Sequence, residues 1–303
     1  MKLKWIITII ILLVLALGIS FISARQTGEE VKQPLETYKI VTTFYPIYGM
    51  VDNLIQGAQN VELTNMTQTN IGCLHDYTLG TNDMRKIEDA DVLIQNGLGL
   101  ESFMDKITAT YPNLPIIDSS SQVTNLLQEG EGKNPHIWTS IKNYQQQLKT
   151  ICEELSKYNP ENEEIYQRNY EQYLQKLEQL SLDFESDLAN LKGKKAICLN
   201  EALTYLANEV GMEVTTIQTN HEESTLSADT LKNLITQMKE KNIQIILVDK
   251  NDNLENAQTL EEETGAKIYQ LDSAMNSKDD NTQPSKEDYY QSMVNNLEVF
   301  KQM

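Results

Sequence analysis

The fold of this chain is decided by the stretch from Pro160 to Gly193, which reads PENEEIYQRNYEQYLQKLEQLSLDFESDLANLKG. Large apolar residues recur in it every three or four positions, which is the spacing of one face of an α-helix. Proline is typical of the first turn of a helix, and glycine of the residue just past its end. The stretch therefore predicts one helix of roughly 30 residues, about 45 Å long at 1.5 Å per residue.

Short apolar runs, which predict strands, alternate with helical patterns on both sides of this helix. The predicted strands lie at 39–45, 60–66, 91–96 and 115–118 before it, and at 195–199, 214–217, 243–249 and 267–271 after it. Strands separated by helices usually pair in parallel. We therefore predict an α/β fold in which two doubly wound βα lobes are joined by one long rigid helix. In such a fold, a ligand binds in the interlobe cleft, where the carboxyl ends of both sheets face each other.

These elements predict the domain organisation. We expect an N-terminal lobe at 38–159, the connecting helix at 160–193 and a C-terminal lobe at 194–303. The polar residues 26–37 predict a flexible linker ahead of the first lobe. Residues 1–25 are more apolar than the rest of the chain, and we predict that they form an export signal or an N-terminal membrane anchor.

The N-terminal segment has the charge pattern of an export signal, because Lys2 and Lys4 precede an uncharged apolar run from Trp5 to Ser23. That run is close to the roughly 20 residues of a membrane-spanning helix, so a cleaved signal and an uncleaved anchor both fit. A lipid anchor would need a cysteine just after the run, and the first cysteine is Cys73. We predict an extracytoplasmic protein, secreted or held at the outer face of the cell membrane by an N-terminal helix.

The charge balance limits the class of partner. The chain has 44 acidic and 25 basic side chains, which give a formal net charge of -19. Such a surface repels nucleic acid phosphates and attracts cations, so nucleic acid is excluded as a partner. The sequence also lacks the GxxxxGK[ST], GxSxG and HExxH motifs of common nucleotide-binding and hydrolytic sites.

Two of the three histidines stand in compact polar and aromatic turns, LHDY at 74–77 and NPHIW at 134–138. Each turn follows a predicted strand of the first lobe, where a strand-to-helix connection would direct the side chain into the cleft. Imidazole nitrogens combined with carboxylate oxygens suit Zn²⁺ or Mn²⁺, whereas oxygen alone would suit Ca²⁺ or Mg²⁺. We predict that His75 and His136 are metal ligands.

The chain resembles the metal-binding solute receptors of ABC importers, the zinc/manganese group known as cluster A-I or the TroA-like family. The resemblance spans about residues 38 to 300. It rests on TTFYPIY at 42–48, LHDYTLGT at 74–81, EDADVLIQNGLGLE at 88–101, NPHIW at 134–138, TGAK at 264–267 and LDS at 271–273.

This resemblance implies four metal ligands, two from each lobe. The slot of the third ligand holds Asn200, whose amide oxygen is a weak ligand for Zn²⁺. The third ligand is therefore expected to be the neighbouring Glu201, Asn200 itself or the loop residue His221. The fourth ligand corresponds to Asp272, directly after the predicted strand 267–271. With His221 the site would have three imidazoles and favour Zn²⁺; without it, two imidazoles and two carboxylates suit Mn²⁺ at least as well.

The resemblance also implies a function. We expect a monomeric receptor, not an enzyme, that captures Zn²⁺ or Mn²⁺ as transported ligand and passes it to an ABC permease driven by a cytoplasmic ATPase. Two alternatives stay open. In a metal-dependent hydrolase, an open coordination position at the site would activate water. An adhesin or other metal-independent interaction protein would bind no metal tightly.

Overall fold

The computed structural model describes residue 5 and residues 36–68, 74–217, 226–276 and 286–303. The export signal or anchor predicted at 1–25 and nearly all of the linker predicted at 26–37 therefore lie outside the described residues. Among the described residues, no helix combines the length and apolarity needed to cross a membrane. Residues Tyr38–Met303 form one compact unit, separate from residues 1–37.

This unit contains two four-stranded sheets in which all strands are parallel. The first has the order β2-β1-β3-β4 and the second the order β10-β9-β7-β8. Numbered within its own half, each sheet thus has the same order, with the second strand at one edge, followed by the first, third and fourth. The strands are β1 (Tyr38–Thr42), β2 (Val61–Asn65), β3 (Val92–Gln95), β4 (Ile116–Asp118), β7 (Lys195–Cys198), β8 (Glu213–Thr216), β9 (Ile245–Asp249) and β10 (Lys267–Leu271).

The central strands β1, β3, β7 and β9 are more buried than the edge strands β2 and β8. Every residue of β9 is buried, while the edge strands β2 and β8 have no fully buried residue. This burial pattern is typical of parallel sheets. The fold confirms the predicted α/β class with two parallel-sheet lobes.

Helices connect these strands, and a short hairpin stands beside them. The helices other than the long one are α2 (Tyr45–Ile55), α3 (Thr81–Glu88), α4 (Met104–Thr110), α5 (Ile141–Tyr158), α7 (Thr204–Glu209), α8 (Ala228–Lys241), α9 (Glu255–Thr264) and α10 (Asp288–Phe300). The hairpin consists of β5 (Gln128–Glu129) and β6 (Gly132–Lys133). It follows β4 and precedes the second histidine turn.

The long helix α6 (Glu163–Asp187) has 25 residues and is shorter than predicted. Its first turn is a separate 3₁₀ turn, Pro160–Asn162, in which the Asn162 amide donates to Asn159 Oδ1 (2.7 Å). After Asp187 the chain forms another 3₁₀ turn, Ala189–Leu191, and then reaches Gly193 at a φ of +78°. The proline and the glycine therefore bracket three consecutive helical segments.

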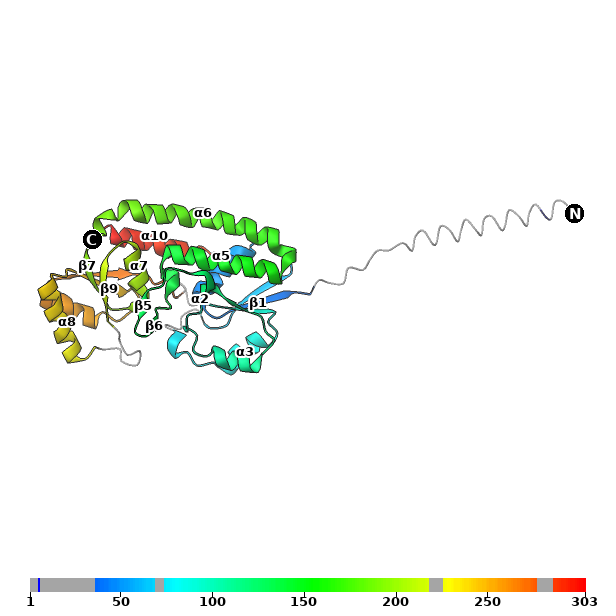
Figure 1. The fold of residues 1–303 in the computed structure, drawn as a ribbon, viewed down its shortest axis with the longest axis horizontal. Helices are drawn as coiled ribbons and strands as arrows, with labels where there is room; N and C mark the ends of the chain where they lie inside the picture. Colours follow the sequence, from blue (N-terminus) through cyan, green and yellow to red (C-terminus); the bar gives the residue numbers. More distant parts are fainter. Residues whose placement is uncertain (1–4, 6–35, 69–73, 218–225, 277–285) are drawn as a thin grey trace. The chain divides into compact units, whose positions relative to one another are not determined.

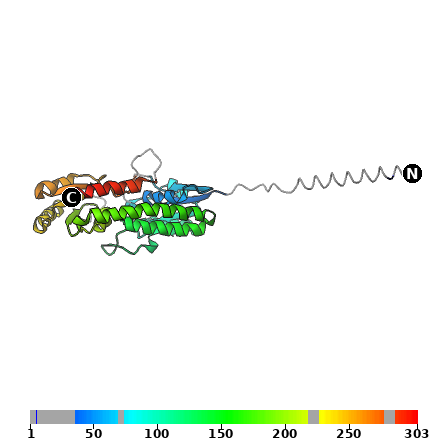
Figure 2. The same ribbon diagram turned by 90° about the horizontal axis from the view of Figure 1, so that it is seen from above.

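Helix α6 packs against elements from both halves of the unit. It lies alongside α5 and contacts α2 and α10 (Figures 1 and 2). Phe184 of α6 meets Phe300 of α10 edge to face, with ring centroids 6.2 Å apart. One continuous cluster of buried apolar residues runs from the first sheet, with Ile40, into the second, with Leu247. The lobe boundaries at 159/160 and 193/194 stay a prediction.

Candidate metal centre

Three side chains with metal-binding atoms converge from the two halves of the unit. His75, His136 and Glu201 each offer one ligand atom, and these atoms all lie within 4.8 Å of one another. The first half thus supplies two imidazoles and the second half a carboxyl group. Two nitrogens and one oxygen at this spacing form a donor set that suits a divalent transition metal.

His75 lies in a 3₁₀ turn, Leu74–Asp76, that follows β2. Leu74 anchors the turn in the apolar core with 1% of its surface exposed, and the Ser102 hydroxyl donates to the His75 carbonyl (3.1 Å). The imidazole itself is half-buried, and its ring centroid lies 5.3 Å from that of His136. The two rings are therefore close enough to bind one ion.

The second imidazole is buried and is oriented by its own turn. His136 is 1% exposed, and both its backbone N–H (2.9 Å) and its Nδ1 (3.1 Å) contact the amide oxygen of Asn134. Because that oxygen is an acceptor, Nδ1 carries the proton and Nε2 carries the lone pair for an ion. The Thr139 hydroxyl fixes the other side of the turn by donating to the His136 carbonyl (2.9 Å).

A buried polar network holds the His136 turn against the end of β3. The Asn96 amide donates to the Pro135 carbonyl (2.9 Å). The Glu101 carboxylate in turn accepts from the backbone N–H groups of Asn96 (2.7 Å) and Gly97 (3.1 Å) and from the Thr43 hydroxyl (2.8 Å). Burial raises the pKa of Glu101 to about 7, and the donated hydrogen bonds oppose that rise.

Glu101→Ala is expected to lower the free energy of unfolding by about 3–5 kcal/mol, because two buried N–H groups and the Thr43 hydroxyl would lose their acceptor. Urea denaturation followed by circular dichroism measures the change. Glu88→Ala is the matched control, since Glu88 is exposed and its removal should change stability by less than about 0.5 kcal/mol. Equal stability of the two variants would contradict the role of Glu101.

Glu201 begins a 3₁₀ turn, Glu201–Leu203, two residues after the end of β7. Its neighbour Asn200 is occupied elsewhere: the amide oxygen accepts from the Ala202 N–H (3.0 Å), and the amide nitrogen donates to Asp252 (2.9 Å). Asn200 therefore caps the turn. Glu201, in contrast, offers a carboxyl oxygen within 4.8 Å of the ligand atoms of both histidines.

The environment of Glu201 favours its protonated form. Burial, a hydrogen bond with Glu129 of the β5–β6 hairpin and the charge of Glu129 raise the pKa of Glu201 to about 8. A cavity of about 380 Å³ opens there and is lined by both carboxyl groups, Asn134 and Thr216. The Asn134 amide also donates to the Glu201 carbonyl (3.3 Å), which ties the His136 turn to the second half.

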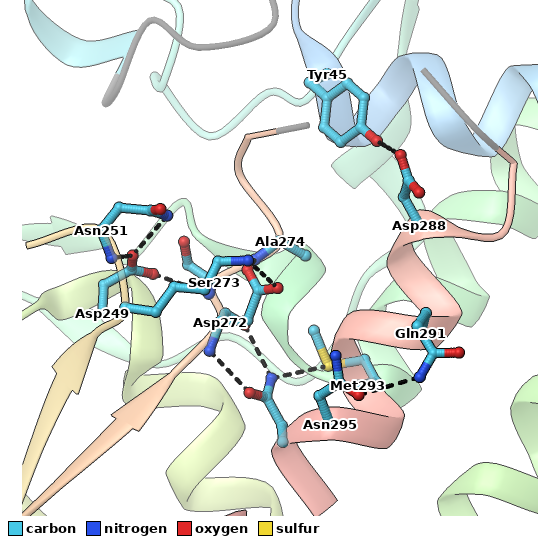
Figure 3. A network of polar contacts seen from close by, with 12 residues as sticks. Tyr45, Asp249, Asn251, Asp272, Ser273, Ala274, Asp288, Gln291, Met293 and Asn295 are labelled. Carbon is cyan, nitrogen blue, oxygen red and sulfur yellow. Dashed lines mark hydrogen bonds and ion pairs between the residues drawn. The ribbon is translucent and has the colours of Figure 1, made fainter. Parts of the chain in front are cut away.

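Asp272 does not belong to the three-residue cluster. It directly follows β10 and is 5% exposed; Oδ1 accepts from the Ala274 N–H (2.9 Å) and Oδ2 from the Lys250 ammonium (2.7 Å; Figure 3 shows Asp272 among its neighbours). The next residue, Ser273, accepts from Trp138 Nε1 (2.9 Å), and the Trp138 ring lies 5.3 Å from the ring of His136. The role of Asp272 as fourth ligand stays a prediction.

Two residues that contact the predicted ligands, Glu129 and Lys250, were not predicted from the sequence. Glu129 is the last residue of β5, and its hydrogen bond with Glu201 joins two segments that are far apart in the sequence. Lys250 follows the predicted strand 243–249 as Asp272 follows 267–271, so parallel pairing of these two strands was the available signal. His221, the alternative third ligand, lies outside the described residues.

Comparison with known proteins places the chain in a family. The model of the family ZnuA, described as zinc-uptake complex component A, periplasmic, matches residues 40–303. The chain belongs to this family. ZnuA membership confirms the predicted class of protein, the substrate-binding component of a metal-uptake system.

Individual ZnuA-like relatives agree with this assignment. The high-affinity zinc uptake system protein ZnuA of Bacillus subtilis (strain 168) is 27% identical over 248 residues, covering 77% of each protein. The zinc-binding lipoprotein AdcA of Streptococcus pneumoniae (strain R6) is 26% identical over 287 residues, which cover 89% of this chain but 56% of AdcA. The chain thus spans about half the length of AdcA.

The fold also matches a solved structure of a metal-bound receptor. The substrate-binding protein FpvC of Pseudomonas aeruginosa, solved in complex with Mn²⁺, superposes with a TM-score of 0.78 at 26% identity. The match covers 88% of this chain and 98% of FpvC. The architecture is therefore that of a substrate-binding protein over nearly its whole length.

Proposed function

We propose that this protein captures one divalent transition metal ion outside the cytoplasm and delivers it to the permease of an ABC importer, which a cytoplasmic ATPase drives. The observation that carries this proposal is the meeting of the donor atoms of His75, His136 and Glu201 within 4.8 Å. Residues of a receptor that takes up metal should converge from both halves in this way. Family membership and the zinc-uptake names of the relatives support the same function.

We infer that zinc is the primary ion and that the three clustered residues bind it together with Asp272. Zinc is named for the family and for both relatives cited above. Manganese is the second candidate, because a site with two imidazoles and two carboxylates suits Mn²⁺ as well, and FpvC was solved with that ion. We infer that Glu201, rather than His221, is the third ligand for either ion.

We further propose that the protein works as a monomer and as a receptor without catalytic activity.

We also propose that the protein acts outside the cytoplasm. The periplasmic family description and the lipoprotein relative support this location. The apolar run at 5–23 supplies either a cleaved export signal or an anchor in the outer face of the membrane.

Calorimetric titration of chelator-stripped protein tests the function directly. We expect one Zn²⁺ per chain, and competition with Mn²⁺ should show which ion binds more tightly. Zinc loading should also raise the melting temperature, because an ion that binds only the folded chain stabilises it. Stripped protein that takes up neither ion would overturn the proposal.

Zinc affinity is expected to fall as the pH decreases from 8 to 6. The pKa of Glu201 is raised to about 8, so below that pH the ion must displace a proton from this carboxyl group. The logarithm of the association constant, measured against a chromophoric chelator, should rise with pH with a slope that falls from about 0.9 at pH 7 to about 0.5 at pH 8.

Glu129→Gln is the control for this pH dependence. It removes the neighbouring carboxyl group that raises the pKa of Glu201 and leaves the three clustered residues in place. The pH range over which affinity changes should therefore move downward in this variant. An affinity that stays constant between pH 7 and 8 in the unmodified protein would contradict the expected proton release.

A further inference from the structure

The buried carboxylate of Asp272 is paired with a lysine that comes from the neighbouring strand. Lys250 Nζ lies 2.7 Å from Asp272 Oδ2, with the side chains 36% and 7% exposed, respectively. The pair follows from the sheet register: Asp249, the last residue of β9, is aligned with Leu271, the last residue of β10. Lys250 and Asp272 are the next residue of each strand, so they leave the same edge side by side.

The backbone and one oxygen of Asp272 are fixed independently of the lysine. Asn296 of α10 accepts from the Asp272 N–H (2.8 Å) and donates to its carbonyl (2.8 Å). Oδ1 accepts from the Ala274 N–H. Lys250 contacts Oδ2 and none of these other groups, so its ammonium can leave without loss of the contacts that hold Asp272 in place.

A neighbouring carboxylate at the same edge shows that a lysine is not required to hold an aspartate there. Asp249 accepts from the Ser273 N–H (2.9 Å) and from the backbone and side-chain nitrogens of Asn251 (2.8 and 2.9 Å; Figure 3). All of these donors are neutral. The contact between the Lys250 ammonium and Asp272 Oδ2 is therefore not needed to hold the loop in place.

We propose that Lys250 is an internal competitor of the metal: its ammonium holds Asp272 Oδ2 when no ion is bound and must withdraw when the ion binds, which lowers the affinity of the site. This inference rests on the proposed function, with Asp272 as fourth ligand. The loop of Asp272 reaches the other ligands through Ser273, whose carbonyl accepts from Trp138 beside His136. Lys250 thereby tunes how readily the receptor gives up its cargo.

The chemistry of the two cations makes the exchange feasible. An ammonium is a single charge on a flexible four-carbon stem, and Lys250 is already more than a third exposed, so the head can turn into solvent. A divalent ion has twice the charge and gains three further donors at the cluster. A bound ion therefore displaces the Lys250 ammonium from Asp272 Oδ2, and the cost of this displacement lowers the affinity for the ion.

Lys250→Met tests the proposal at pH 8, with Lys267→Met as the matched control. Both variants remove one lysine charge from the same sheet, but Lys267 is exposed at the opposite end of β10 and has no part in the pair. We expect Lys250→Met to bind Zn²⁺ about 10-fold to 100-fold more tightly than the unmodified protein, the range that loss of one charge-assisted hydrogen bond predicts. Lys267→Met should change the affinity much less.

A second measurement uses the unmodified chain and does not depend on how a variant folds. Reductive methylation followed by mass spectrometry should label Lys250 faster with Zn²⁺ bound than after chelation, while labelling of Lys267 stays constant. Equal or weaker affinity of Lys250→Met relative to Lys267→Met, or unchanged labelling of Lys250, would overturn the inference. In that case the unmodified protein would still bind zinc, whereas failure of the proposed function would leave all three proteins without zinc.

Discussion

Replacing His136 with alanine is expected to weaken zinc binding by more than about 100-fold. Loss of a residue that only orients a ligand commonly costs about 10-fold to 100-fold in metal affinity, and a direct ligand should cost more. His136 is 1% exposed, and its Nε2 is the nitrogen available to an ion because Nδ1 donates to Asn134. Calorimetric titration of the stripped variant, or competition with a chelator for tight sites, measures the loss.

Two further variants serve as controls: one tests a residue that only orients His136, and the other tests a histidine outside the proposed ligand set. Asn134→Ala removes the acceptor that orients the ring but leaves the imidazole, so its loss should stay within about 10-fold to 100-fold. His221→Ala should bind zinc as the unmodified protein does, because Glu201 already completes the cluster with both other histidines. A His136→Ala protein that keeps its affinity would remove the foundation of the proposed site, provided that its circular dichroism spectrum is native.

Trp138→Ala is expected to reduce the free energy of unfolding by about 5 kcal/mol. Truncation of a buried aromatic residue costs about 3–5 kcal/mol, and a lost hydrogen bond adds about 1 kcal/mol. Trp138 is 0% exposed, meets Phe44 edge to face at 5.0 Å and donates to Ser273 (2.9 Å). Since domains are stable by only about 5–15 kcal/mol, this variant should unfold at a much lower urea concentration.

Two comparison variants, Trp138→Phe and Leu182→Ala, should lose less unfolding free energy than Trp138→Ala. Phenylalanine keeps most of the packing and loses the hydrogen bond to Ser273, so about 1–3 kcal/mol should be lost. Leu182 is 57% exposed on α6, and its truncation should cost less than about 1 kcal/mol. If Trp138→Ala were no less stable than Leu182→Ala, the ring would not be a structural link between the His136 turn and the Asp272 loop.

Much of the fold could be predicted because local patterns specify it. The strand predicted at 267–271 has the same bounds as β10. The strand predicted at 39–45 ends earlier, at Thr42. Phe44 is already the N-cap of α2, which is a local feature, and the Thr43 hydroxyl donates to Glu101, a tertiary contact that β-branched composition does not reveal.

The site was predictable only in part, for a similar reason. The two histidine turns have distinctive local sequences, and the fold brings both together with Glu201, the residue beside the expected slot. Whether Asn200 or Glu201 faces the histidines depends on which of them caps the turn after β7, and that depends on Asp252, 52 residues later along the chain. The pairs Glu129–Glu201 and Lys250–Asp272 likewise join distant segments.

The apolar core that continues from one sheet into the other, past α6, makes the two halves a single cooperative unit. Heating should therefore produce one melting transition, and an ion held by residues of both halves should delay that transition for the whole chain. Because proteases cut mainly opened chains, copies that carry cargo would outlast empty ones wherever extracellular proteolysis is active. Metal supply would then govern how long each receptor survives as well as how often it delivers.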